Sequence, residues 1–179
     1  MAPIGSAPAQ LVMIGLVTGA EVFGALPRAA AGRVADYMNS ELAEVLTISQ
    51  ASTEDVEAGA EVGELSLALR QVTYVQPWGT AEVLLSEIPV TALPRFTGTA
   101  VETELVLRTR ISVSGTILLP AGIDLVGMLT RADERFVRLV SARLRTPNGE
   151  IRETDGVLVN REQIMLFRRI THKELTRPG

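Results

Sequence analysis

The residues that could carry chemistry are few. The single histidine, His172, lies in the C-terminal stretch THKELTRPG, and the chain has no cysteine. One histidine without cysteine cannot build the usual zinc sites, and it leaves no thiol nucleophile and no disulfide framework. The acidic residues Glu54, Asp55 and Glu57 lack the spacing of a calcium-binding EF-hand loop, so we interpret them as part of a solvated loop.

Signatures of nucleotide-binding and hydrolase sites are also missing from the sequence. It contains no G-x-x-x-x-G-K-[ST] and no G-x-G-x-x-G stretch, the loops that cradle phosphate groups. The stretch SVSG, Ser112 to Gly115, lacks the G-x-S-x-G pattern of a nucleophile elbow. We therefore expect no catalytic residue, no metal ligand and no cofactor, and we expect that the protein is not an enzyme.

Arginine is the residue type with the most uneven distribution. Residues 1–90 carry 3 basic and 11 acidic side chains, a net charge of −8, whereas residues 91–179 carry 14 and 10, a net charge of +4, which gives −4 for the chain. An ordinary polar face opposite the core explains these arginines unless they gather on one surface, where they could contact phosphates or a protein partner. The candidate interaction surface comprises Arg138, Arg143, Arg145, Arg161, Arg168 and Arg169.

An internal repeat predicts the elements that position these arginines. The stretches Glu64–Pro77 and Gly156–Ile170 share alternating apolar residues about 92 positions apart, with a polar interruption at Asn160 to Gln163 in the second. Alternation on both sides of a short interruption is typical of two strands joined by a tight turn. The alternation also predicts that Ile164 and Leu166 point inward, so that truncating Leu166 to alanine would cost roughly 2–5 kcal/mol.

Each copy is expected to read strand, short helix, strand, turn, strand, strand. Helical spacing follows Pro27 in the first copy, at Val34, Tyr37 or Met38, and Glu41 or Leu42; it follows Pro120 in the second, at Ile123, Val126 and Leu129. Gly127 limits the second helix to two or three turns. Asn148-Gly149 is a strong hairpin signal and predicts a tight turn between two strands of the second copy.

These patterns predict a mainly β (α+β) protein, a tandem pair of small antiparallel β units that each carry one short helix. We place the units at residues 11–77 and 105–170, joined by an ordered connector at 78–104, with a disordered N-terminus at 1–10 and a tail at 171–179. The most apolar stretch, Leu11 to Leu26, contains Glu21 and is shorter than a membrane span, so we expect no span and a cytoplasmic location.

Two stretches carry a family resemblance. DERFVRLVSARL, Asp133 to Leu144, followed by VLVNREQIMLF, Val157 to Phe167, resembles the Sm-like fold. This resemblance implies a small, strongly bent antiparallel barrel of a kind that forms rings and often binds RNA. Val137 stands where that family has its RNA-contacting asparagine, and Asn160-Arg161 replaces its Arg-Gly. Each copy also resembles an uncharacterised, duplicated bacterial domain family, a likeness that implies no activity.

Three functional hypotheses follow. The leading one is a non-catalytic protein-interaction or assembly protein that forms a homo-oligomer or docks on a protein partner. The alternative is an Sm-like nucleic-acid-binding protein that uses the arginine-rich second unit. A net charge of −4 and 4% aromatic residues favour the first hypothesis, because nucleic-acid binding needs a basic face and usually aromatic platforms. An enzyme with a carboxylate site of unfamiliar spacing is the third.

Overall fold

The computed structural model describes residues 10–26, 34–39, 44–53, 62–78, 98–130 and 134–170. The described residues are mainly β, as the sequence predicts. The strands are β1 (Leu11–Leu16), β2 (Glu21–Ala25), β3 (Val45–Thr53), β4 (Val62–Ala68), β5 (Val72–Trp78), β6 (Thr99–Leu107), β7 (Ser112–Leu119), β8 (Phe136–Arg145), β9 (Ile151–Asn160) and β10 (Ile164–Arg169). Two short helices, α1 (Val34–Met38) and α3 (Leu125–Thr130), and two 3-10 turns, Leu69–Gln71 and Arg161–Gln163, complete the described elements.

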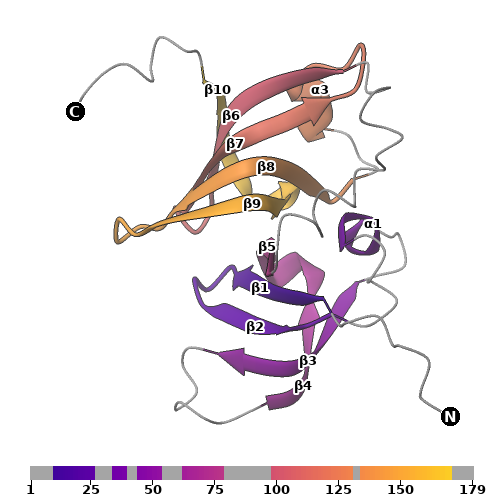
Figure 1. Cartoon of the computed structure of the whole chain (residues 1–179), viewed down its shortest axis with the longest axis vertical. Helices are drawn as coiled ribbons and strands as arrows, with labels where there is room; N and C mark the ends of the chain where they lie inside the picture. Colours follow the sequence, from indigo (N-terminus) through magenta and orange to yellow (C-terminus); the bar gives the residue numbers. More distant parts are fainter. Residues whose placement is uncertain are drawn as a thin grey trace, which may run out of the picture.

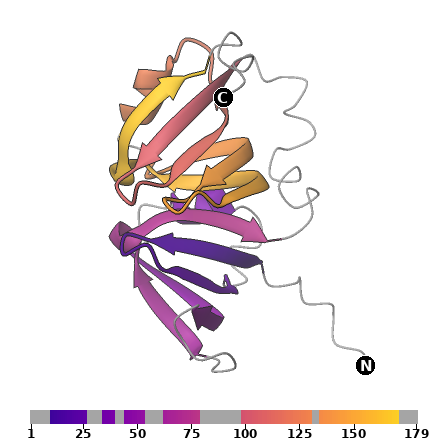
Figure 2. The same ribbon diagram turned by 90° about the vertical axis from the view of Figure 1, so that its left-hand side faces the viewer.

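All ten strands form one antiparallel sheet in the order β10-β6-β7-β8-β9-β5-β1-β2-β3-β4. We call β1–β5 the first half and β6–β10 the second half. Within each half the fifth strand lies beside the first, and the fourth strand lies at the other end. The two halves are stacked along the long axis of the molecule, and each curls into a bent sheet (Figures 1 and 2).

Both halves bend at the same kind of irregularity. Gln50 in β3 and Ser141 in β8 adopt left-handed backbone conformations, with φ of 52° and 49°. The pairing register shifts beside each of them, as it does at a β-bulge. The strand opposite carries a glycine at this point, because a Cβ on Gly115 would lie 3.0 Å from the carbonyl oxygen of Val140. Bulges sharpen the local twist, so these positions let five strands curl around a core.

The core consists of two apolar clusters that exchange side chains between the halves. The cluster of the second half includes Met13 and Tyr74, which belong to the first half. The cluster of the first half includes Phe136 and Leu158, which belong to the second half. Each of these four side chains is no more than 3% exposed. The two halves are therefore packed into one another and share their apolar burial.

The structure corrects the predicted order of elements. Each half has two strands before its helix where the sequence predicted one, because a turn separates β1 from β2 and another, at Arg108–Arg110, separates β6 from β7. The amide of Leu107 donates to the carbonyl of Ile111 across that turn, and Arg110 takes a left-handed φ of 65°. α3 spans the six residues Leu125–Thr130, and the next three residues, 131–133, lie outside the described part of the chain. The hairpin at Asn148-Gly149 is confirmed, with Gly149 at a φ of +90°.

The prediction that Leu166 points inward is wrong. Its side chain is 56% exposed, whereas Ile164 packs against the core of the second half. The register of β10 on β6 shifts between these two residues, so Met165 forms a bulge. One extra residue reverses the faces that the later side chains occupy. A large loss of stability is therefore no longer expected from truncation of Leu166 in an isolated chain.

Several predicted segments lie wholly or partly outside the described residues. These are the predicted N-terminus up to residue 9, the acidic loop at 54–61, most of the connector, 79–97, and the tail at 171–179, which includes His172. The final residues of the predicted connector belong to a strand, because β6 begins at Thr99. No helix in the described part of the chain has the length and apolar character needed to cross a membrane.

Candidate interaction edges and the junction between the halves

The two halves meet where β5 pairs with β9. Tyr74 lies opposite Val159, and Val75 lies opposite Leu158. Tyr74 and Val159 pack in the cluster of the second half, while Val75 and Leu158 pack in that of the first. Alternate side chains of one strand pair thus serve two cores, which explains why residues 156–160 are buried on both faces although β9 is exposed at alternate positions before them. This strand pair is the central junction of the molecule.

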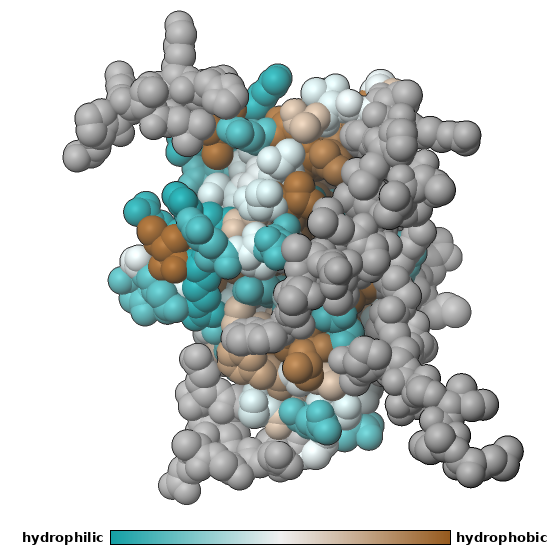
Figure 3. Space-filling model, in the orientation of Figure 1, coloured by the Kyte–Doolittle hydropathy of each residue, from teal (hydrophilic) through white to brown (hydrophobic). Residues whose placement is uncertain are grey.

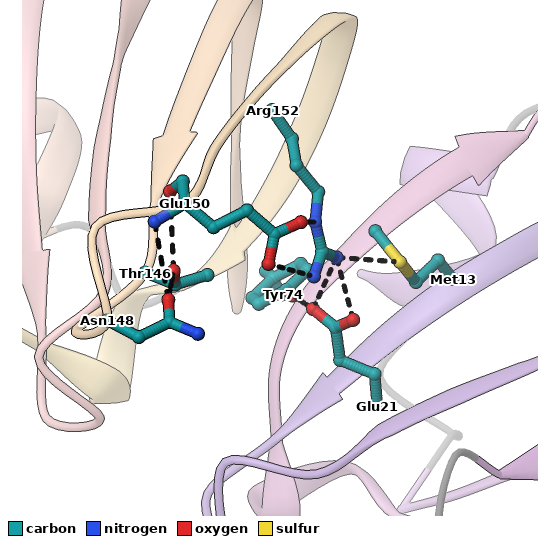
Figure 4. Close-up of polar contacts among 7 residues, drawn as sticks. All are labelled: Met13, Glu21, Tyr74, Thr146, Asn148, Glu150 and Arg152. Carbon is teal, nitrogen blue, oxygen red and sulfur yellow. Dashed lines mark hydrogen bonds and ion pairs between the residues drawn. The ribbon is translucent and has the colours of Figure 1, made fainter.

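A buried ion pair reinforces the junction (Figure 4). Glu21, at the start of β2, has a side chain only 7% exposed, and the Nη1 of Arg152 in β9 donates to both of its carboxylate oxygens at 2.7 Å. The hydroxyl of Tyr74 donates to the same carboxylate. Glu150 accepts from the Nε of Arg152 at 2.8 Å on the other side of the guanidinium. The buried charge of Glu21 therefore has both a cation and a neutral donor, as buried charges require.

The pKa values of Glu150 and Arg152 are both shifted in the direction that stabilises their charged forms. The hydrogen bond and charge of Arg152 hold the pKa of Glu150 below its ordinary value of 4.5. The pKa of Arg152 is raised by the hydrogen bond to Glu150 and then by Glu21, against the opposing effect of burial. Both shifts mean that the charged forms are preferred in the folded protein.

The lowered pKa of Glu150 predicts a specific acid response. Such a group adds stability above its unfolded pKa, near 4.5, and this contribution disappears as the pH falls through the lower folded pKa. We expect Glu150→Gln to be less stable than the wild type at pH 6, with the difference narrowing below about pH 4.5. Urea unfolding of both proteins at several pH values measures this, and a difference that is independent of pH contradicts it.

Two asparagine side chains fix the backbone of one half to the other. The Nδ2 of Asn160, fully buried at the end of β9, donates to the carbonyls of Leu69 at 3.3 Å and Val72 at 2.8 Å. Its Oδ1 accepts from the amide of Glu162 and caps the second 3-10 turn. Asn39, after α1, makes a two-way contact with the backbone of Phe136, at 2.7 and 3.1 Å. The halves are therefore held in one relative orientation.

Beyond the junction, the described sheet ends in two edge strands, β10 and β4. On the face shown in Figure 3, apolar residues reach the surface in separate places among polar ones. On β10, three consecutive apolar side chains are exposed: Met165 by 65%, Leu166 by 56% and Phe167 by 37%. An exposed apolar run on an edge strand differs from isolated exposed apolar residues, because the backbone groups of an unpaired strand edge can accept another strand.

Comparison of the chain with protein-family models, with curated proteins and with solved structures finds no match. A functional proposal therefore rests on the structure of the described residues. That part of the chain contains no group of three or more His, Cys, Asp or Glu side chains that could hold a metal ion. Its most distinctive surface feature is the exposed apolar run on the edge strand β10.

The six predicted arginines lie on three elements: Arg138, Arg143 and Arg145 on β8, Arg161 in the second 3-10 turn, and Arg168 and Arg169 on β10. In the sheet order, β6 and β7 separate β10 from β8. Arg143 pairs with the carboxylate of Glu153 at 2.7 Å and Arg168 pairs with that of Glu104 at 2.5 Å, both on neighbouring strands. Their charge is thus partly compensated within the chain.

A groove of about 620 Å³ opens beside Arg143 on the outer surface of the second half. Hydroxyl and charged groups line it, including Ser114, Thr116, Glu153 and Asp155. The described residues that have a buried side-chain nitrogen or oxygen without a hydrogen-bond partner are not among its lining residues; they are Thr73, Gln76, Thr109 and Arg161. Among the described residues that line the groove, none therefore has a buried polar side-chain atom without a hydrogen-bond partner.

Proposed function

We propose that this protein is a non-catalytic assembly protein, built from two homologous β units, that associates with other protein chains through its exposed edge strand β10. The observation that carries this proposal is the run of exposed apolar side chains from Met165 to Phe167 on a strand with one unpaired side in the described sheet. Edge strands offer a row of backbone donors and acceptors to an incoming strand. Apolar side chains beside that row add burial to the pairing.

Recurrent details support the interpretation of the halves as homologous units. The 3-10 turns at Leu69–Gln71 and Arg161–Gln163 each join the fourth strand to the fifth. The fifth strand of each half pairs with the first through a register shift, after Val72 in one and Ile164 in the other. The amides of Val17 and Arg108 donate to the carbonyls of Gln71 and Gln163, at 2.9 Å in both halves. These matching hydrogen bonds and register shifts support the proposal that the two halves are copies of one unit.

The opposite charges of the two halves favour association in a head-to-tail manner. With −8 on residues 1–90 and +4 on residues 91–179, the acidic half of one chain attracts the arginine-rich half of another. Such attraction between exposed charges is screened by salt, because the Debye length falls from about 10 Å at 0.1 M to about 3 Å at 1 M. Association that weakens as salt rises is therefore part of the proposal.

The test of this function is a charge placed on the β10 edge. We expect the wild type to associate with rising concentration in sedimentation velocity runs, and Leu166→Lys to remain monomeric. Because Leu166 is more than half exposed, the variant should keep the thermal midpoint of the wild type. Val126→Lys is the matched control, since Val126 is a 53% exposed apolar residue that lies on α3 and not on an edge strand.

Two outcomes would contradict the proposed function. One is a wild type that stays monomeric at every concentration up to about 1 mM, where a contact with a binding free energy of about −4 kcal/mol would be substantially populated. The other is a Leu166→Lys variant that associates as the wild type does. A random oligonucleotide added in the same runs examines the alternative function, because binding through arginines would give a complex that weakens steeply with salt and is indifferent to Leu166→Lys.

A further inference from the structure

At the internal junction, the fifth strand of one half, β5, pairs with the fourth strand of the other half, β9. β5, which follows the first 3-10 turn, pairs with β9, which precedes the second. β10 follows the second 3-10 turn as β5 follows the first, and β4 precedes the first turn as β9 precedes the second. The two edges of the described sheet are therefore a second set of the same two strand types.

From this correspondence we propose that the occupant of the β10 edge is strand β4 of a second copy of the chain, paired in the register of the internal junction. The inference rests on the proposed function and specifies its partner. Within one chain the two edges cannot meet, because β10 lies in the upper half of the molecule and β4 at the far end of the lower half (Figures 1 and 2). The contact is heterologous, so it either closes into a ring of chains or continues as a filament.

The register follows from residue numbers. The 3-10 turns begin at Leu69 and Arg161, so corresponding residues around them are 92 positions apart. The internal pairs Tyr74–Val159 and Val75–Leu158 then become Leu166–Leu67 and Phe167–Ser66 between copies. Continuing the antiparallel ladder by two residues places Arg169 opposite Glu64.

The chemistry of these pairs is complementary. Leu67 is half-buried against the core of the first half, so Leu166 of the other copy would extend that core, as Tyr74 extends the core of the second half. Arg169 and Glu64 are both exposed and carry opposite charges, and opposite charges in directly opposed positions stabilise a strand pair. Each edge thus presents the apolar or charged group that the other needs.

Backbone chemistry also favours pairing at these edges. Pro77 in β5 has no amide hydrogen, and the internal ladder is limited to two residue pairs. Arg169 occupies the corresponding position of β10, and its backbone amide can donate a hydrogen bond where Pro77 of β5 cannot. The intermolecular ladder can therefore be longer than the internal one. It lacks the buried ion pair and Asn160, since Ala68 stands at the position of Asn160, so the contact between copies is weaker than the junction within a chain.

Cysteine cross-linking tests the register directly, because the natural chain has no thiol. Opposed residues of an antiparallel pair lie about 4.5–5.5 Å apart between Cα atoms, within the range that a disulfide spans. We expect Ser66→Cys and Phe167→Cys, mixed as single variants under mild oxidant, to form a disulfide-linked dimer. Val126→Cys mixed with Ser66→Cys is the control and should form little. A dimer from Phe167→Cys alone that forms as readily as the mixture would show β10–β10 pairing and overturn the inference.

Charge reversal provides the second, independent measurement. Arg169→Glu and Glu64→Arg should each weaken association about tenfold, because each places like charges opposite one another. The double variant restores the opposite charges and should associate within about threefold of the wild type. If Leu166→Lys abolishes association while neither the cross-link nor the charge rescue is seen, the proposed function stands and the β4 partner is wrong. If Leu166→Lys has no effect, both fail.

Discussion

Replacing Arg152 with methionine will lower the free energy of unfolding by roughly 3–5 kcal/mol, the usual effect of removing one member of a buried ion pair. The reason is Glu21, whose carboxylate is 7% exposed and receives both hydrogen bonds of its ion pair from Arg152. Without the guanidinium, the Glu21 carboxylate is buried without a compensating cation. Urea unfolding near neutral pH measures the loss.

Two further variants separate the charge effect from lost packing. In Glu21→Gln/Arg152→Met the neutral amide can still accept from the Tyr74 hydroxyl, so the double variant should be more stable than Arg152→Met alone. Arg143→Met removes an exposed ion pair with Glu153 and should change stability by less than about 1 kcal/mol. If Arg152→Met is as mild as Arg143→Met, the junction does not depend on its buried charge.

Truncating Phe136 to alanine should cost a similar amount, about 3–5 kcal/mol, because the ring is 1% exposed and its removal leaves a cavity. The cavity lies in the cluster of the first half although Phe136 belongs to the second. We therefore expect one cooperative transition, in which tryptophan fluorescence from Trp78 and far-ultraviolet circular dichroism give the same midpoint.

Phe167→Ala, measured at low protein concentration, is the comparison for Phe136→Ala. Because Phe167 is 37% exposed, its truncation should lower the free energy of unfolding much less. A transition of Phe136→Ala that separates into two steps would show that the halves unfold independently. It would mean that the exchange of side chains between the clusters contributes little to the coupling of the halves.

Local patterns in the sequence predicted much of the fold. The alternation around Asn160 and the Asn148-Gly149 pair are local signals, set by residues that are neighbours in the sequence. The strands and turns that they predict are found at these positions. The position of Leu166 could not be predicted this way, because the bulge at Met165 arises from the pairing of β10 with β6. A shift of one residue reverses the face of a strand without any change in local composition.

The buried ion pair was missed for a similar reason. Glu21 and Arg152 are 131 residues apart, and nothing in the spacing of either residue indicates the other. A signal was nevertheless present, because Glu21 interrupts the apolar stretch Leu11–Leu26. A charge inside such a stretch indicates a buried partner as well as arguing against a membrane span.

Of the predicted arginines, Arg169 alone lies opposite an acidic residue in the proposed contact between copies.

The exchange of side chains between the two clusters also sets the order in which the molecule can be completed during synthesis. A ribosome that has made β1 to β5 has produced every strand of the first half but neither Phe136 nor Leu158, which fill its core. The core of the nascent first half therefore stays incomplete until Phe136 and then Leu158 have been synthesised. A chain that stops before residue 158 would contain all five strands of the first half but would lack Leu158 from its core.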